Sequence, residues 1–212
     1  FWEICRILRG KIKHMDFISE DFESFSDNLA LQYLCNFSIF QSLPDSWAID
    51  QLFPIVPISR LKELPTEHCI LVDITCDSDG KIDLFIGERS TENTLRVHEI
   101  KSGENYRIGI FLTGAYQEIL GDLHNLFGDT NTFHVSLTKN GKLKYEQIIK
   151  GEDVTDVLDY VQFRADELEG RMAGYLISCV QSSQITQKEA DDFLNLYKEG
   201  LNGYTYLLHP NP

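Results

Sequence analysis

The chain has 212 residues, 42% of them hydrophobic, which is enough to bury most of its apolar surface in one or two compact units. Its 33 acidic and 19 basic residues give a net charge of -14 at pH 7. This charge argues against nucleic acid or an anionic membrane as a partner and is compatible with a cationic ligand. No apolar run is long enough to cross a bilayer.

The cysteine and histidine patterns bound the chemistry further. Five cysteines form an odd set without a Cys-x-x-Cys pair, which favours reduced thiols and a cytoplasmic location over a disulfide framework. The histidines lack any spacing that suits metal ligands, so we expect no metal site built from them. The five cysteines are Cys5, Cys35, Cys69, Cys76 and Cys179.

Residues 1–33 have the apolar period of helices. Trp2, Ile4, Cys5, Leu8 and Ile12 repeat near the helical period, and Ser19 is placed to cap a second helix. We expect this segment to be the end of a helical bundle. Because the sequence starts at Phe1, without a methionine and already inside a helical pattern, we also expect it to be a piece of a longer protein.

The period then changes. Leu34 to Phe40 reads as a strand, and the stretch from Trp47 to Asp50 is too short for a helix of its own, so Asp50 is expected on a turn. Pro54 and Pro57 confine the next segment to an edge or irregular strand.

The most informative stretch is Asp73-Ile-Thr-Cys-Asp-Ser-Asp-Gly80, between an apolar strand at 69–72 and a second strand at 82–86. Cys76 lies in this loop with carboxylates on both sides, an arrangement that suits a cleft better than a hydrophobic core. Taken alone, the stretch also fits a simple turn with a small buried thiol. A calcium loop is excluded by spacing, because Ile86 would take the twelfth position, which needs an acidic residue.

Further strands are expected near 95–97 and at 106–112, the latter apolar almost throughout and expected to be buried on both faces. Residues 117–126 have helical spacing. The clearest hairpin is at 133–145, where Asn140-Gly141 favours a type I′ turn.

Beyond Gly151 the pattern is helical to the end, and Thr186 with Glu189 forms a capping box for the last helix. We therefore predict an α+β fold with a mostly antiparallel barrel or sandwich, divided into residues 1–33, a β domain at 34–150 and a helical extension at 151–212.

Four long stretches resemble the C-terminal part of the biosynthetic arginine decarboxylases, which are pyridoxal-phosphate enzymes of the alanine-racemase-like fold. The resemblance covers the chain from about Tyr33 onward. Its stretches are residues 33–54, Asp73 to Gly80, residues 114–130 and Gly203 to Leu207.

The resemblance implies a head-to-tail dimer, in which a (β/α)8 barrel absent from this sequence carries the cofactor lysine. Cys76 is similar to the cysteine that reaches into the neighbouring subunit's site, and Asp77 to the carboxylate that holds the cationic end of the substrate. A thiol above the α-carbon can deliver a proton, and an aspartate can pair with a guanidinium in a fork.

Other positions follow from the same resemblance. Tyr116, with Gly114 before it, is similar to the tyrosine that holds the cofactor phosphate, and Asp50 resembles an aspartate that sets substrate specificity. His124 falls at a pocket wall where related ornithine decarboxylases carry phenylalanine. Phe40 stands where they carry tyrosine.

The implied function is decarboxylation of L-arginine to agmatine for polyamine synthesis, with pyridoxal 5'-phosphate and a magnesium dependence. None of the chain's lysines resembles the cofactor-binding motif, so we expect the isolated chain to be inactive. Two alternatives remain open at this point: a decarboxylase of another basic amino acid, and a non-catalytic homologue that acts as a partner subunit.

Overall fold

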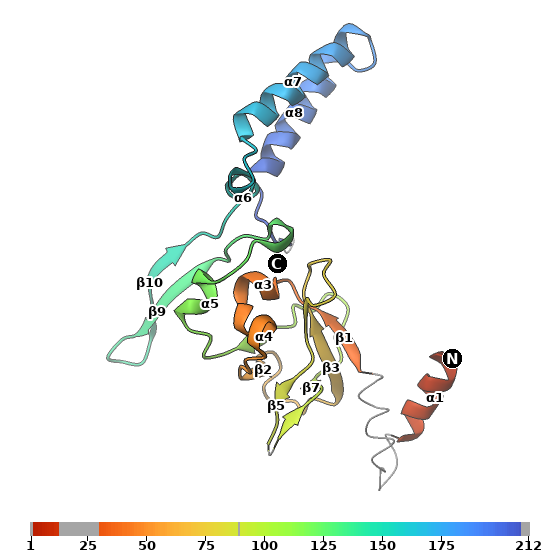
Figure 1. Ribbon diagram of the computed structural model, residues 1–212, viewed down its shortest axis with the longest axis vertical. Coiled ribbons are helices and arrows are strands. Elements are labelled where there is room, and N and C mark those ends of the chain that lie inside the picture. The colour runs from red at the N-terminus through yellow and green to blue at the C-terminus, as the bar shows by residue number, and fades with distance from the viewer. Residues whose placement is uncertain (1, 13–29, 89, 209–212) are drawn as a thin grey trace. The chain divides into compact units, whose positions relative to one another are not determined.

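The computed structural model describes residues 2–12, 30–88 and 90–208 (Figure 1). The chain divides into two compact units. The first contains Phe1–Ile39 and Leu43–Ile119, and the second contains Phe40–Ser42 and Leu120–Pro212.

The N-terminal segment contains one of the two predicted helices. Helix α1 spans Trp2–Ile12, as the apolar period predicts. The second predicted helix, which would begin near Ser19, lies outside the described residues. Strand β1, Leu31–Leu34, begins within the segment for which we had predicted helix.

A sheet built around β3, Glu67–Val72, forms the core of the first unit. Strand β1 pairs with it in parallel along one edge. On its other edge, the end of β3 pairs antiparallel with β4, Lys81–Ile82, and its start pairs with β7, Leu95–Val97. The buried side chains of this unit include Ile39, Leu43, Cys69, Leu71, Ile82, Phe85 and Val97.

The predicted strand at 34–40 is wrong. The chain leaves the sheet after β1 and forms a short helix, α3, at Ile39–Ser42. The reason is tertiary: a carboxylate oxygen of Asp73 accepts the backbone N–H of Ile39 at 2.9 Å, which satisfies a donor at the start of the helix. Local periodicity could not reveal this contact, because the two residues are distant in sequence.

Helix α4, Pro44–Ile49, begins with proline at its first turn and ends at Asp50 in the left-handed conformation, with φ 56°. The predicted edge strand is confirmed as β2, Ile55–Pro57, which pairs antiparallel with β8, Ile108–Ile110. The expected double burial of 106–112 is wrong, since β8 is half-buried and Leu112 is 86% exposed. Strands β5, Phe85–Ile86, and β6, Thr91–Glu92, form a further small pair.

The helix predicted at 117–126 is only partly correct. Helix α5 spans Ala115–Ile119, and a separate 3-10 turn, η1, spans His124–Leu126. At Gly121 the chain passes so close to the Gln41 carbonyl that an added Cβ would lie 2.5 Å from it, which limits this position to glycine.

Strands β9, Thr132–Leu137, and β10, Leu143–Ile149, form the predicted hairpin. The type I′ turn is wrong, because Gly141 has φ +72° while Asn140 is not among the residues with positive φ. Thr138 accepts from Gly141 N at 2.9 Å and its own N donates to Lys142 O at 2.8 Å, so the loop is one residue longer and ends in a left-handed glycine.

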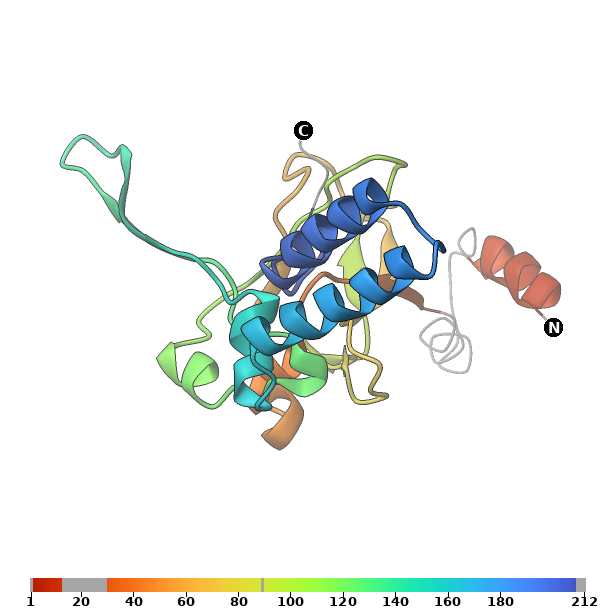
Figure 2. The same cartoon turned by 90° about the horizontal axis from the view of Figure 1, so that it is seen from above.

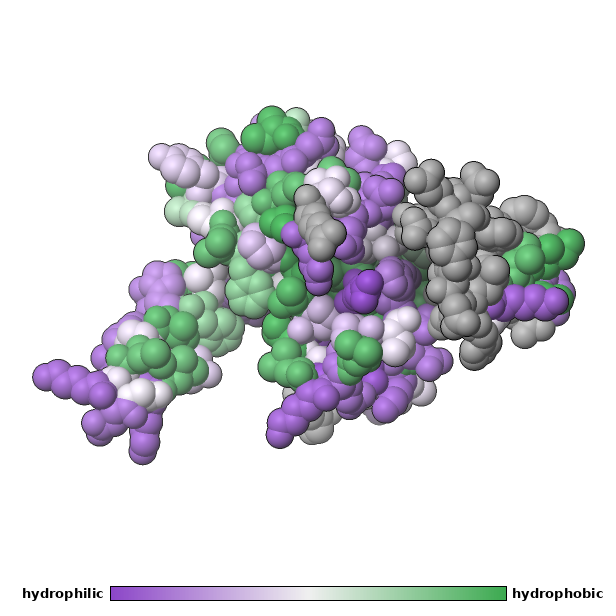
Figure 3. Space-filling model, turned by 90° about the horizontal axis from the view of Figure 1, so that it is seen from below, coloured by the Kyte–Doolittle hydropathy of each residue, from purple (hydrophilic) through white to green (hydrophobic). Residues whose placement is uncertain are grey.

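One face of the hairpin is apolar. The register places Leu137 opposite Leu143, Val135 opposite Tyr145, and Phe133 opposite Ile148. All six of these side chains are more than half exposed. Figure 3 shows this arm at the lower left, with hydrophobic side chains along it and hydrophilic ones at its tip.

The helical end of the chain is confirmed. Helix α6 spans Val154–Tyr160, and α7, Ala165–Gln181, and α8, Gln187–Leu201, run side by side in Figure 2. Both reciprocal bonds of the Thr186 and Glu189 capping box are present. The side chains of Leu176, Cys179 and Ala190 are buried in this helical part.

The fold is α+β, as predicted, with antiparallel pairing in every strand pair except β1 with β3. The described strands form four small sheets and no closed barrel. Among the described residues, no helix has both the length and the apolarity that a membrane span requires.

Candidate functional site

The loop that follows β3 is fixed by hydrogen bonds to the buried side chain of Asp73. This residue is 1% exposed, and its Oδ1 accepts the Thr75 N–H at 2.9 Å and the Thr75 hydroxyl at 2.7 Å. At the far end, Asp73 N donates to Gly80 O at 2.8 Å, and Asp79 N donates to the Asp77 carboxylate at 2.9 Å. These bonds fix the loop on both sides of Cys76, whose side chain is exposed.

Cys76 differs from Cys35 and Cys69. Burial raises the pKa of Cys35 to about 11. Burial, together with the neighbouring Cys35, raises the pKa of Cys69 to about 12. At neutral pH these two thiols stay protonated, whereas the side chain of Cys76 is exposed and accessible to a reactant.

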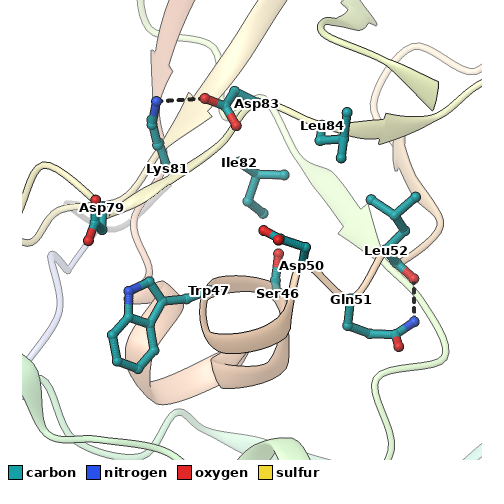
Figure 4. Close-up of a pocket in the computed structure, with 10 residues that line it drawn as sticks. All are labelled: Ser46, Trp47, Asp50, Gln51, Leu52, Asp79, Lys81, Ile82, Asp83 and Leu84. Atoms are coloured by element: carbon teal, nitrogen blue, oxygen red, sulfur yellow. Dashed lines mark hydrogen bonds and ion pairs between the residues drawn. The ribbon is translucent and has the colours of Figure 1, made fainter.

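Asp50 lines an open groove of about 260 Å³ in the first unit, between α4 and residues 79–84, which include β4. Figure 4 shows the groove, with Lys81 turned toward Asp83, to which it is ion-paired at 2.6 Å. The groove is lined by the carboxylates of Asp50, Asp79 and Asp83 and by the single ammonium group of Lys81, so it has an excess of negative charge. Its walls are Ser46, Trp47, Asp50, Gln51, Leu52, Asp79, Lys81, Ile82, Asp83 and Leu84.

Two hydrogen bonds join the helix that precedes Asp50 to the helix that carries Tyr116. Gln117, only 5% exposed, donates to the Asp45 carboxylate at 2.6 Å and accepts the Asp45 N–H at 3.2 Å. Tyr116 itself is 74% exposed. Gly114 has φ +70°, and an added Cβ there would meet nothing within 4 Å, so its backbone is open to a ligand.

His124 belongs to the second unit. Its ring packs against Phe40, with the ring centroids 4.5 Å apart and the planes at 39°. The structure thus brings into contact two of the positions that the resemblance singled out. Phe40 is only 3% exposed, so the contact fixes one face of the His124 ring against the protein interior.

The structure thus brings Cys76 and Asp77 together on one loop, and ties the helices of Asp50 and Tyr116 through Gln117. Sequence reasoning missed Gln117 and the structural role of Asp73, although the latter stood in the acidic stretch it singled out. Of the loop carboxylates, Asp79 and not Asp77 lines the groove with Asp50. Within the described residues, no group of three or more His, Cys, Asp and Glu side chains is arranged to hold a metal.

Comparison with known proteins gives consistent matches. Residues 154–207 match the family model of the arginine decarboxylase C-terminal helical extension. The biosynthetic arginine decarboxylase of Bacteroides thetaiotaomicron is 50% identical over 98% of this chain and 33% of its own length. That of Thermosynechococcus vestitus is 47% identical over 98% of this chain and 32% of its own length.

A solved structure agrees. The crystal structure of the biosynthetic arginine decarboxylase SpeA from Campylobacter jejuni has a TM-score of 0.72 and 35% identity. The match covers 84% of this chain and 29% of that chain. The chain therefore spans about a third of the length of the curated relatives it matches.

Proposed function

We propose that this chain is the C-terminal part of a pyridoxal-phosphate-dependent biosynthetic arginine decarboxylase, which converts L-arginine to agmatine and carbon dioxide for polyamine synthesis. The observation that carries the proposal is the identity of 50% to a protein of that name over 98% of this chain. The match of residues 154–207 to the helical extension of that family supports the same part of the protein. Membership of the alanine-racemase-like fold is part of this proposal, although the described strands of this chain form four small sheets and no closed barrel.

Cys76 is the residue that we assign to protonation. Decarboxylation breaks the bond between the α-carbon and the carboxylate, carbon dioxide leaves, and the electron pair that remains on the α-carbon must take up one proton. An exposed thiol on a loop held at both ends can deliver that proton from Sγ to one face of the carbon. Cys69 is buried and Cys35 is half-buried, and the raised pKa values of both thiols suit them less well to this task.

Asp77 is assigned to the distal end of arginine. A guanidinium is planar and permanently charged, and carboxylate oxygens bind it bidentately. The acidic groove beside Asp50 supports a cationic substrate, and Asp50 is the second candidate for this contact. We place His124 on the wall of the substrate pocket.

The residues present fit one end of the cofactor. The exposed Tyr116 hydroxyl and the open backbone at Gly114 would hold its phosphate. When bound, pyridoxal 5'-phosphate supplies an electron sink for the pair released on loss of carbon dioxide. The lysine that anchors it would come from the barrel of the longer protein. The magnesium dependence stays a prediction.

The active enzyme in this proposal is a cytoplasmic homo-oligomer with sites shared between two subunits. The alternatives are a decarboxylase of another basic amino acid and a non-catalytic partner subunit. Cys76, Asp77 and Tyr116 speak against the second, because an interaction-only protein has no need of them.

The test is kcat/KM for arginine, ornithine and lysine in the full-length enzyme and its Asp77→Ala and Asp50→Ala variants. We expect arginine to be preferred and Asp77→Ala to lose about 2–5 kcal/mol of transition-state stabilisation, because one partner of a desolvated charge pair is truncated. Asp50→Ala should cost less or shift the preference among basic substrates. Near-wild-type arginine turnover in Asp77→Ala would remove this residue from the site.

A further inference from the structure

Asp73 is a buried carboxylate that the proposed reaction does not use. It is 1% exposed, and no ion pair to it is present in the part of the chain that the structure describes. A buried carboxylate without a cation is costly unless hydrogen bonds stabilise it. Among the described residues, the donors to this carboxylate include Ile39 N at 2.9 Å, Thr75 N at 2.9 Å and the Thr75 hydroxyl at 2.7 Å.

The geometry of these donors requires a carboxylate. Ile39 N binds Oδ2, while both donors of Thr75 bind Oδ1, so acceptors are needed on both sides of the group. An asparagine has one acceptor oxygen and an NH₂ group that only donates. With asparagine at this position, the N–H of either Ile39 or Thr75 would face another donor.

The same carboxylate is enclosed by the far end of the loop. A Cβ added to Gly80 would overlap Asp73 Oδ1 and would lie 2.7 Å from the Thr75 hydroxyl. The loop therefore closes over Asp73 only because residue 80 has no side chain. Thr75 extends the contact, since its hydroxyl lies 3.4 Å from Asp77 N.

We propose that Asp73 is a positioning residue for the reaction. Its carboxylate binds the start of helix α3 and so fixes the loop that carries Cys76 and Asp77. This inference rests on the proposed function, because it assigns the loop a task at the α-carbon and the guanidinium. Asp73 touches neither. It acts through Thr75, which lies next to Cys76 in the chain.

The test uses the full-length protein with Asp73→Asn, and Thr75→Val as a second variant that keeps the buried carboxylate and its bond to Ile39. Ser78→Ala is the control, because it removes an exposed hydroxyl from the same loop. Two quantities are measured: amide hydrogen exchange of residues 74–77, and KM and kcat for arginine separately.

We expect Asp73→Asn and Thr75→Val to accelerate exchange in the loop on the order of tenfold, as expected when a buried donor or acceptor loses its partner. KM for arginine should rise and kcat should fall, each about tenfold. A merely structural loss would reduce the amount of active enzyme and leave KM unchanged. Ser78→Ala should match the wild type in both measurements.

Unchanged exchange in Asp73→Asn and in Thr75→Val would overturn the proposal. So would accelerated exchange with unchanged KM and kcat, since the loop would then move without consequence for the substrate. If the wild-type full-length protein does not act on arginine, the proposed function fails, and with it the catalytic part of this inference. The exchange arm would still report whether Asp73 fixes the loop.

Discussion

Cys35 and Cys69 show how burial sets the chemistry of a thiol. Their pKa values are raised to about 11 and about 12, so both stay protonated in the folded protein well above the pH at which an unfolded thiol ionises. The native state then binds more protons than the unfolded state, and its stability must fall as pH rises. The contribution of these two thiols to stability is fully present below about pH 8.5, the ordinary pKa of a thiol, and is lost as the pH rises through their pKa values in the folded protein.

We therefore predict that the free energy of unfolding of the 212-residue chain declines between about pH 8.5 and pH 11, and that a Cys35→Ala/Cys69→Ala double variant declines less steeply. Urea unfolding at several pH values in this range measures both slopes. Equal slopes in the two proteins would show that these thiols do not drive the loss.

For single residues, the sequence predicted properties that depend on the neighbouring residues in the chain. The acidic residues flanking Cys76 predicted an accessible thiol, and the structure has Cys76 exposed. Sequence reasoning did not find the bond of Asp73 to Ile39 or that of Gln117 to Asp45, because each joins segments more than 30 residues apart in the chain. The roles of Cys76, Asp77 and Tyr116 remain predictions.

Among the elements, helix α6 depends on its N-terminal cap. The Asp153 carboxylate accepts the Asp156 N–H at 3.2 Å, and the Asp156 carboxylate accepts the Asp153 N–H at 3.0 Å. Partial burial acts to raise the pKa of Asp153, but the Asp156 N–H and the Lys150 ammonium outweigh it, so the pKa lies below its ordinary value.

Asp153→Ala should cost about 1 kcal/mol of stability at neutral pH, the usual value of an N-cap, and less as the pH falls through the lowered pKa of Asp153. Denaturant unfolding at neutral and acidic pH measures this. Asp159→Ala, an exposed position near the end of the same helix, is the control and should change little. Equal costs for the two variants would contradict the capping role.

The β9–β10 hairpin gives a second prediction about a single structural element. Val135, Leu137 and Leu143 are already more than half exposed, so replacing all three with threonine removes little burial and keeps a strand-forming residue. We expect the stability of the 212-residue chain to change by less than about 0.5 kcal/mol per site. Leu71→Ala, at a side chain 1% exposed, should cost about 2–5 kcal/mol. A loss of that size in the hairpin variant would mean that its apolar face is covered.

Elements with strong local patterns were predicted well, and those decided by distant contacts were not. The period of the apolar residues in α7 and α8, together with the capping box at Thr186, was sufficient to predict these helices. Asn140-Gly141 predicted a hairpin but not its turn type, because the loop adopts a longer form with only Gly141 left-handed. At 34–40, alternating apolar residues suggested a strand where a contact from Asp73 starts a helix.

For the whole molecule, the proposed function requires Cys76 to act in the site of a neighbouring subunit. A full-length Cys76→Ala subunit mixed with a subunit that lacks the cofactor lysine should form heterodimers with one intact site, and activity should reappear. Each variant alone serves as the control. No recovery after subunit exchange, with exchange itself verified, would place Cys76 in the site of its own subunit or outside any site.

Carbon dioxide release from L-arginine in the presence of pyridoxal 5'-phosphate tests whether this chain is part of an arginine decarboxylase. The full-length protein should release carbon dioxide and form agmatine in equal amounts, and the 212-residue chain alone should release none, because the lysine-bearing barrel is not among its residues. Steady release of carbon dioxide by the 212-residue chain, or no release by the full-length protein, would contradict the proposed function.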